Sequence, residues 1–289
     1  MTELVAPRPF DPAQTVDVRV HRFESGQWQA TDDEVATEEP LEIRLNGDSL
    51  AVIMRTPGAD SCLAMGFLLA EGIIGSISDI EGWRIGQDRD GFPDANTIDF
   101  RLRSGSARLN TANRQFIVSS SCGRCGTATI AAAMAHSAAI ELDLPNQTIA
   151  VAELLSLDLK LRVEQAVFSR TGGLHAAGLF DRFGHLLAVQ EDVGRHNAVD
   201  KIIGEQAIAR HLPLSGTVLL VSGRASFELV QKAAVAGIPI LAAVGAPSSL
   251  AVELARASQI TLVGLLRNRR FVTYSHPERI AVGVQYVAP

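Results

Sequence analysis

The sequence predicts an α/β protein whose core is a mostly parallel sheet, because continuous apolar strands alternate with helical segments in its second half. Three apolar runs are separated by two segments with helical spacing: strands at 217–221, 238–244 and 260–265, and helices at 226–236 and 249–257. The runs show no polar alternation, so both faces of each strand are expected to be buried. The pattern therefore predicts a three-layer core with helices on both sides of the sheet.

Shorter strands with period-two alternation precede this core, at 16–21 and 41–45. Asn46-Gly47-Asp48 follows the second strand and predicts a hairpin turn, because Asn and Gly tolerate the positive φ angles that such turns require. A further strand pair is expected near 97–103 and 115–119.

An apolar helix is expected between these strands, with Asp60 as its N-cap and Gly72 at its end. Cys62 falls on this helix and is expected to be a small buried side chain. Together with the short strands, the helix predicts a smaller N-terminal α+β domain.

The chain divides into three predicted parts. Residues 1–15 contain three prolines and little periodicity, which is typical of a flexible tail. Turn-forming residues at 105–114 mark a soft boundary. The N-terminal domain is therefore placed at 16–112 and the core at 113–289.

Composition excludes several classes of protein. The 289 residues carry a net charge of −6, so a wholesale basic surface for nucleic acid is not expected. The chain has no basic-apolar leader and no apolar run long enough for a membrane span. Three cysteines are too few for a disulfide scaffold. A cytoplasmic protein without membrane or nucleic-acid partners is predicted.

Two of these cysteines, Cys122 and Cys125, form a Cys-x-x-Cys motif between an apolar run and an Ala-rich helical pattern. A helix N-terminus lowers the pKa of a thiol and populates the thiolate, and Arg124 adds positive potential. Two vicinal thiols could hold a metal, form a redox disulfide or carry a persulfide sulfur. The residues alone leave these possibilities open.

Metal binding is the least favoured of the three. A structural zinc site needs four ligands, and the chain has no second Cys-x-x-Cys motif. Zinc deaminases place His-x-Glu before Pro-Cys-x-x-Cys, whereas here residue 121 is Ser and His276-Pro277-Glu278 follows the cysteines. We therefore predict no metal site, and a thioredoxin-like redox role remains a weaker alternative.

Three glycine-bearing loops are expected at the carboxyl ends of strands, at 119–126, 222–226 and 245–249. Ligands bind at this edge of an open α/β sheet, and helix N-termini favour anions there. The alternative interpretation is a set of tight connections with capping serines.

A second polar cluster surrounds two glycine-bearing turns and is predicted to be functional: His175, Glu191, Asp192, Arg195, His196 and Asn197. Its alternative interpretation is a helix start at Asn197 capped by Asp192. A basic turn, Arg267-Asn268-Arg269-Arg270, follows the last apolar strand and suits phosphate recognition.

Six ordered segments resemble one family, the formate dehydrogenase accessory sulfurtransferases (the FdhD family). The resemblance runs from about Asp60 to His276. The segments are Ser-Ser-Cys-Gly-Arg-Cys-Gly at 120–126, Thr-Gly-Gly-Leu-His-Ala-Ala at 171–177, Glu-Asp-Val-Gly-Arg-His-Asn-Ala-Val-Asp-Lys at 191–201, Ser-Gly-Arg-Ala-Ser-Phe-Glu-Leu-Val-Gln-Lys at 222–232, Ala-Gly-Ile-Pro-Ile-Leu at 236–241 and Ala-Pro-Ser-Ser-Leu-Ala-Val-Glu-Leu-Ala at 246–255.

The resemblance implies a sulfurtransferase that takes sulfur from a cysteine desulfurase and passes it to the molybdenum bis-guanine-dinucleotide cofactor of formate dehydrogenase. It implies a persulfide on Cys122, with Cys125 as the second cysteine of the pair. The implied cofactor-binding segment comprises Leu265, Leu266, Arg267, Asn268, Arg269 and Arg270.

The resemblance also implies a cytidine deaminase-like core, a homodimer, and the formate dehydrogenase apoprotein as a partner. An alternative function is a non-catalytic chaperone that binds and delivers the cofactor.

Overall fold

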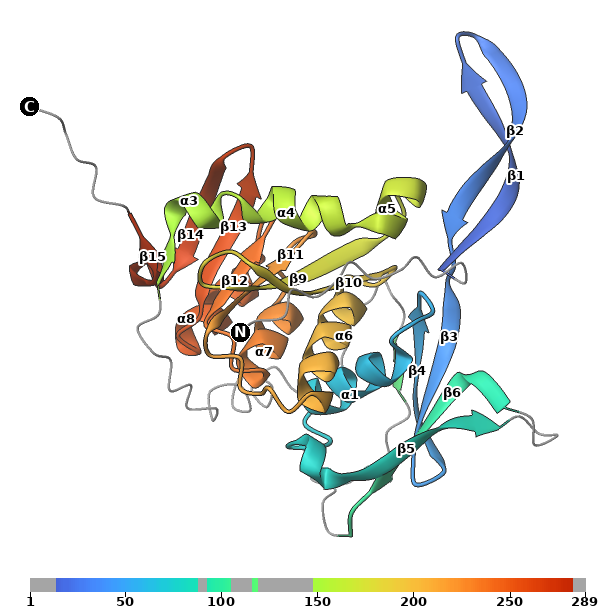
Figure 1. The fold of residues 1–289 in the computed structure, drawn as a ribbon, viewed down its shortest axis with the longest axis horizontal. Helices are drawn as coiled ribbons and strands as arrows, with labels where there is room; N and C mark the ends of the chain where they lie inside the picture. The colour runs from blue at the N-terminus through green and yellow to red at the C-terminus, as the bar shows by residue number, and fades with distance from the viewer. Residues whose placement is uncertain (1–13, 88–92, 105–115, 119–147, 283–289) are drawn as a thin grey trace, which may run out of the picture.

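The computed structural model describes residues 14–87, 93–104, 116–118 and 148–282 (Figure 1). Cys122 and Cys125, the predicted boundary at 105–114 and most of the predicted tail lie outside these residues. The proposed division into two domains therefore stays a prediction. None of the helices in the described ranges is both long enough and apolar enough to cross a membrane.

A six-stranded sheet forms the larger part of the molecule, in the order β10-β9-β11-β12-β13-β14. Its strands are β9 (His175–Asp181), β10 (Leu186–Asp192), β11 (Thr217–Val221), β12 (Ile240–Ala243), β13 (Thr261–Arg267) and β14 (Arg270–Ser275). The predicted strand at 217–221 is confirmed, and those at 238–244 and 260–265 are found with shifted ends.

The sheet is mixed, so the predicted parallel arrangement is found for its central strands but not for its edges. Neighbouring strands pair in parallel only at β11–β12 and β12–β13, and β10 runs in the same direction as these three but is separated from β11 by β9. The outer strands join through short hairpin turns, which make β9–β10 and β13–β14 antiparallel, and β9 is also antiparallel to β11. An apolar run shows that a strand is buried but not which way its neighbour runs.

Helices cover both faces of this sheet, which confirms the predicted three layers. On β11, Leu219 and Val221 pack into one apolar cluster, with α6 (Arg195–Ile208), α7 (Phe227–Val235) and α8 (Ser249–Ala257). Val218 and Leu220 pack into another, with α3 (Val151–Leu154) and α4 (Leu157–Glu164). Each fully buried Leu or Val contributes about 1.5–3 kcal/mol, so both faces of β11 stabilise the fold.

A five-stranded sheet precedes this core, in the order β5-β6-β3-β4-β7. Its strands are β3 (Glu39–Leu45), β4 (Asp48–Arg55), β5 (Ile80–Gln87), β6 (Pro93–Leu102) and β7 (Phe116–Val118). The predicted hairpin between β3 and β4 is confirmed, with φ of 52° at Asn46 and 90° at Gly47.

Both predicted strands near 97–103 and 115–119 exist, but they do not pair with each other. Strand β6 lies between β3 and β5, whereas β7 pairs in parallel with β4. Pairing over this sequence distance depends on tertiary packing and leaves no local signal.

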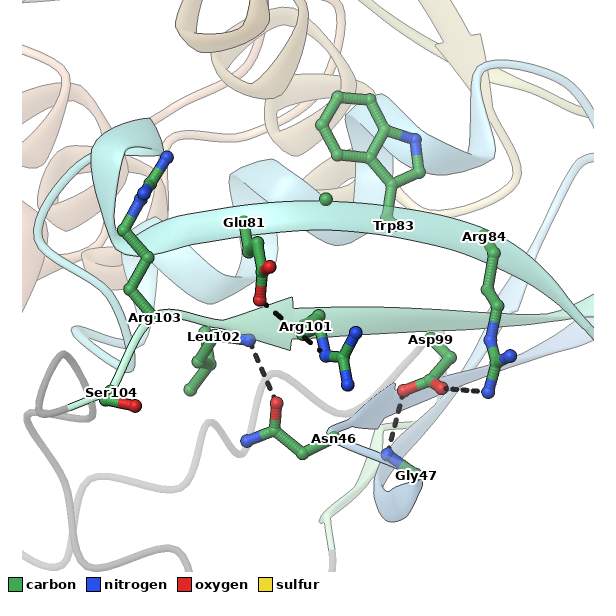
Figure 2. Close-up of a pocket in the computed structure, with 11 residues that line it drawn as sticks. Asn46, Gly47, Glu81, Trp83, Arg84, Asp99, Arg101, Leu102, Arg103 and Ser104 are labelled. Carbon is green, nitrogen blue, oxygen red and sulfur yellow. Dashed lines mark hydrogen bonds and ion pairs between the residues drawn. The ribbon is translucent and has the colours of Figure 1, made fainter.

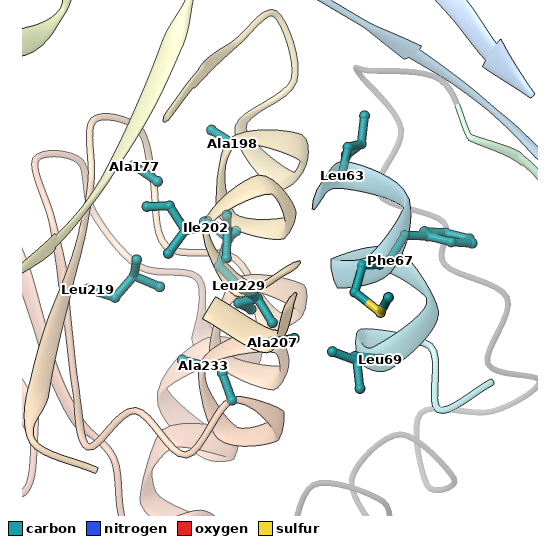
Figure 3. Close-up of a cluster of buried hydrophobic side chains, with 14 of the residues drawn as sticks. Leu63, Phe67, Leu69, Ala177, Ala198, Ile202, Ala207, Leu219, Leu229 and Ala233 are labelled. Atoms are coloured by element: carbon teal, nitrogen blue, oxygen red, sulfur yellow. The ribbon is translucent and has the colours of Figure 1, made fainter. Parts of the chain in front are cut away.

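Helix α1 (Asp60–Ala70) joins the two sheets by packing against α6, within one continuous apolar cluster (Figure 3). A methyl group on Gly66 would overlap the Asp200 carbonyl, and one on Gly204 would overlap the Cys62 carbonyl. The two backbones therefore touch where the helices cross, and Cys62 is partly buried there.

The ends of α1 differ partly from the prediction. Ala59 is the N-cap, with φ of 55°, and Asp60 is the first helical residue. The Asp60 carboxylate instead accepts two hydrogen bonds from Arg55, at 3.1 and 3.0 Å. Gly72 follows the helix with φ of 66°, as predicted.

A two-stranded ribbon, β1 (Thr15–Glu24) and β2 (Gln27–Ala36), projects from the body of the molecule (Figure 1). The predicted strand at 16–21 is part of β1. Near its base, Glu34 forms an ion pair with Arg170 of α5 (Ala166–Thr171).

Candidate functional site

Two of the three predicted glycine-bearing loops meet at the carboxyl edge of the six-stranded sheet. The backbone N–H of Gly245 donates to the carbonyl of Gly223 at 2.9 Å, and that of Ser248 donates to the carbonyl of Ala225 at 3.0 Å. Parallel strands β11 and β12 bring their following loops together in this way. The third predicted loop, 119–126, lies outside the described residues.

The start of β9 reaches the same edge because β9 runs antiparallel to β11. Ser222 and Ala176 exchange two hydrogen bonds of 2.9 Å, one of them to the Ser222 hydroxyl. His175 contacts Gly223, the loop residue that follows Ser222. A methyl group on Gly223 would be 3.4 Å from the Nδ1 atom of His175.

The N-terminus of α6 completes this arrangement. The same methyl group on Gly223 would be 3.8 Å from Cδ of Arg195, the first residue of α6. His175 and Arg195 therefore both lie next to Gly223. Both residues were predicted from the sequence to belong to a functional cluster. The helix begins at Arg195, two residues earlier than predicted.

Asp192 does not cap α6, so that alternative interpretation is wrong. The N-cap is Gly194, which has no side chain that could cap the first turn of the helix. The fully buried Asp192 carboxylate accepts from the backbone of Gly194 and Thr56 and from the Asn197 side chain. It also forms a 2.7 Å ion pair with Lys201.

Several residues of the predicted polar cluster thus have structural roles. Asn197 also donates to the Met54 carbonyl at 2.8 Å, and Lys201 donates to the Thr56 carbonyl at 2.8 Å. These contacts tie the end of β4 to the start of α6. Glu191 accepts from the backbone of Val167 and Phe168 at the start of α5, and burial raises its pKa.

The two buried lysines of this region are paired, whereas the partly buried Arg195 is not. Lys201 contacts Asp192, and Lys232 forms a buried ion pair with Asp200. By contrast, Nε of Arg195 is buried and has no hydrogen-bond partner, and its guanidinium forms no ion pair with any described residue. A buried donor without an acceptor is costly, so the Nε atom of Arg195 is available to donate to an anion.

Four exposed arginines extend this positive surface: Arg224, Arg267, Arg269 and Arg270. Arg224 lies in the loop after β11, against which Gly245 packs. Gly245 in turn accepts a 3.0 Å hydrogen bond from the backbone of Leu265. The loops therefore form one continuous edge that carries several cations.

The predicted basic turn is a two-residue β-hairpin turn between β13 and β14. Asn268 and Arg269 have φ of 53° and 56°, as a tight hairpin requires, and the turn is exposed. Leu265 also has a positive φ of 55°, at an irregularity in the β13–β14 pairing. Leu266 differs from its predicted neighbours because it is buried in the apolar cluster on the α4 side.

Two histidines near Arg195 are held neutral. Burial lowers the pKa of His175. The positive charge of Arg195 lowers it further, and the negative charge of Asp192 opposes this shift. Burial, with Lys232 and Arg195 nearby, lowers the pKa of His196 to about 3. His196 Nε2 lies 3.1 Å from the Ser226 hydroxyl and 3.8 Å from Glu228. Both imidazoles therefore carry no charge at neutral pH.

A cavity of about 470 Å³ opens beside His175 and Ser222. Its other wall comes from the α4–α5 segment and includes Arg162, Gln165 and Phe168. These three residues carry no local signal of function in the sequence, because only the packing of α4 and α5 against the sheet brings them to the site.

A second hollow, of about 800 Å³, lies on the five-stranded sheet (Figure 2). Its charged side chains largely neutralise one another: Arg84 pairs with Asp99 at 3.2 Å and Arg101 with Glu81 at 3.6 Å. None of the described residues that line this hollow has a buried polar side-chain atom without a partner, as Arg195 has, so we place the candidate site at the carboxyl edge of the six-stranded sheet.

Comparison with known proteins links this fold to one family. The model of the FdhD/NarQ family matches residues 36–281. A sulfur carrier protein FdhD from Streptomyces avermitilis is 48% identical over 267 residues, which cover 91% of this chain and 95% of the relative. A protein of the same name from Sulfolobus acidocaldarius is 44% identical over 263 residues, which cover 91% and 97%.

A solved structure has the same mixed α/β fold. It comes from Desulfotalea psychrophila and was assigned as a formate dehydrogenase accessory protein. It is 25% identical to this chain, with a TM-score of 0.72, and the match covers 93% of this chain and all of that one. The family match spans both sheets and every loop of the candidate site, and the chain therefore belongs to the FdhD/NarQ family.

Proposed function

We propose that this chain carries sulfur for the maturation of formate dehydrogenase. Its relatives are named sulfur carrier proteins, and its structural neighbour is assigned as a formate dehydrogenase accessory protein. In this proposal, a cysteine desulfurase donates sulfur as a persulfide to Cys122. The sulfur then passes to the molybdenum bis-guanine-dinucleotide cofactor, which is the substrate.

The observation that carries the proposal is the unpaired, buried Nε of Arg195 at the carboxyl edge of the sheet. A guanine dinucleotide brings phosphates, whose oxygens suit the forked donors of arginine. Arg224 and the turn at Arg267–Arg270 add further donors along the same edge.

The direction of β7 supports a shared location for sulfur and acceptor. Val118, its last residue, pairs in parallel with Ile53 of β4. Strand β4 then runs on towards Thr56, whose backbone N–H donates to Asp192 beside the start of α6. Strand β7 thus ends on the side where α6 begins, and Cys122 follows four residues later in the sequence.

The chemistry requires two sulfur transfers. The Cys122 thiolate attacks the terminal sulfur of the desulfurase persulfide, so an S–S bond forms on Cys122 and the desulfurase thiolate leaves. That terminal sulfur is later transferred to the cofactor as a neutral sulfur atom, so the S–S bond breaks, Cys122 returns as a thiolate, and the acceptor supplies the two electrons that reduce the sulfur to the sulfide level. A thiolate at neutral pH needs a lowered pKa, which a helix N-terminus and Arg124 would favour.

Mass spectrometry after incubation with a cysteine desulfurase and cysteine tests the first transfer. We expect the peptide that contains Cys122 to gain one sulfur atom, and a Cys122→Ala variant to lose this gain. A Cys125→Ala variant is the matched control, because it removes the neighbouring thiol only. Full sulfur loading of the Cys122→Ala protein would contradict the assignment of Cys122.

The second candidate function is a non-catalytic chaperone that binds the cofactor at the arginine-rich edge and delivers it. It predicts that Cys122→Ala still supports formate dehydrogenase activity in a strain that lacks the native gene, whereas sulfur transfer predicts loss of activity. The cytidine deaminase-like core, a homodimer and a cytoplasmic location belong to the same proposal, and sedimentation of the purified chain tests the dimer.

A further inference from the structure

We propose that the β1–β2 ribbon is an exchange arm: in a dimer with two-fold symmetry, the ribbon of each copy lies along helix α4 of the other. The inference rests on the homodimer of the proposed function and names the two surfaces that form it.

The ribbon has little support from the rest of its own chain. Its strands form a separate two-stranded sheet, and every residue from His21 to Ala30 is exposed. Contacts with the body lie near the base, where Glu34 pairs with Arg170 of α5. A two-stranded ribbon is marginally stable in water, so one of this length needs a further surface to pack against.

The outer half of the ribbon has one apolar face and one polar face. Phe23 and Trp28 lie opposite each other with ring centroids 5.1 Å apart, and they are 59% and 68% exposed. His21 and Ala30 form the next row on the same face. The other face carries polar residues: Arg22, Glu24, Gln27 and Gln29. Exposed aromatic rings on one face of an arm are typical of a protein–protein contact.

The inner half has its apolar residues on the opposite face, at Val16, Val18, Val20 and Val35. The two strands cross about half-way along the ribbon in Figure 1, so the ribbon turns over between its two halves. This twist brings the valines of the inner half and the aromatic rings of the outer half to the same side. The ribbon therefore offers one continuous apolar side to a single docking surface.

Helix α4 presents a matching apolar strip. Leu159 and Val163 lie one turn apart on its outer face and are 67% and 81% exposed, whereas Leu157 and Leu161 pack inwards. Leu159 also lines the cavity beside His175. An arm that covers this strip would therefore border the mouth of that cavity, so the second copy would contribute to the candidate site.

The position of α5 favours a second copy as the occupant. Helix α4 leads into α5, the base of the ribbon packs on α5, and α4 and the ribbon extend from it in different directions (Figure 1). Within one copy, the ribbon leaves Leu159 and Val163 exposed. A two-fold axis beside α5 would bring the ribbon of one copy alongside α4 of the other, and the same contact would repeat in reverse.

The buried area favours exchange over docking on an unrelated protein. A ribbon with 10 residues in each strand is about 33 Å long and roughly 10 Å wide, so one side covers about 330 Å². One arm on one receiving surface would bury about 650 Å² in total, which is typical of a weak contact. Two exchanged arms would bury about 1,300 Å², which lies within the range of stable interfaces.

Sedimentation equilibrium of the full chain tests the exchange with two double variants. Phe23→Gln/Trp28→Gln removes the aromatic face of the arm. Leu159→Gln/Val163→Gln removes the strip on α4. Because a symmetric dimer of either variant loses both arm contacts, we expect the dimer dissociation constant to rise about hundredfold or more. Ile85→Gln, at an exposed apolar residue of β5, is the control and should sediment as the wild type does.

A mixture of the two double variants is the decisive measurement. A mixed dimer pairs the intact arm of the α4 variant with the intact α4 of the ribbon variant, so it regains one of the two contacts. We therefore expect the mixture to dimerise about tenfold more tightly than either variant alone. A variant that had merely unfolded could not be rescued in this way.

Four results would overturn the inference. They are a monomeric wild-type chain, wild-type dimerisation of the ribbon variant, wild-type dimerisation of the α4 variant, and a mixture that dimerises no more tightly than its components. Sulfur loading of Cys122 is measured separately, so failure of the exchange is distinguishable from failure of the sulfur-carrier function.

Discussion

At the scale of single residues, His196 couples the candidate site to pH. Its side chain is buried against Ser226, and its pKa falls to about 3, well below the ordinary value of 6.5. The unfolded chain therefore binds a proton at His196 between about pH 3 and 6.5, and the folded chain does not. Folding stability is then lost as the pH falls through this range.

We expect the loss from His196 between pH 7 and pH 5 to be about 2 kcal/mol of unfolding free energy. Denaturant titrations at both pH values measure it. A His196→Gln variant, whose amide can still pair with Ser226, should show a smaller difference between the two pH values. His21→Gln, on the exposed ribbon, is the control. An unchanged pH dependence in His196→Gln would contradict burial of a neutral imidazole.

At the scale of elements, the crossing of α1 and α6 holds the two sheets together. Glycines make this contact possible, because a Cβ atom at Gly66 or Gly204 would overlap a backbone carbonyl of the facing helix. A backbone carbonyl cannot move aside as a flexible side chain can. Helix α6 also carries Arg195 at its start, so its placement decides the geometry of the site.

Gly204→Ala should therefore destabilise the protein although alanine is the better helix former. We expect a loss of about 3 kcal/mol, the upper end for overpacked cores. Gly82→Ala is the matched control, because no atom lies within 4 Å of its added Cβ. Denaturant unfolding of both variants measures the effect. Equal stability of Gly204→Ala and wild type would show that the helices can separate without cost.

At the scale of the whole molecule, the sequence predicts turns and buried strands from local signals, but it does not predict which distant strands pair. The hairpin turn at Asn46-Gly47 and strand β11 followed from turn chemistry and an apolar run. Local signals did not predict the direction of β9 and β14 or the partner of β7, because pairing between distant strands depends on packing.

The same distinction applies to the candidate site. His175 and Arg195 could be selected because each lies near glycines in a short polar segment. Gln165 and Phe168 could not, because their neighbours across the cavity are distant in sequence. Asp192 and Asn197 look functional in the sequence, yet they mainly hold β4 against α6.

We expect that contact to make the two sheets unfold as one cooperative unit. Asp192 and Lys201 are both buried, and Lys201 also donates to Thr56 at the end of β4. Lys201→Met would leave the Asp192 carboxylate buried without its cation, which costs about 3–5 kcal/mol. We expect a large fall in the midpoint of denaturant unfolding and still a single transition.

The double variant Lys201→Met/Asp192→Asn supplies the decisive comparison. It removes both charges, so it should recover much of the lost stability, because a neutral amide is far less costly to bury than a carboxylate. If the pair also positions the start of α6, weak pyrophosphate binding in Lys201→Met should recover in the double variant as well. Recovery of stability without recovery of pyrophosphate binding would show that the ion pair stabilises the fold but does not position Arg195.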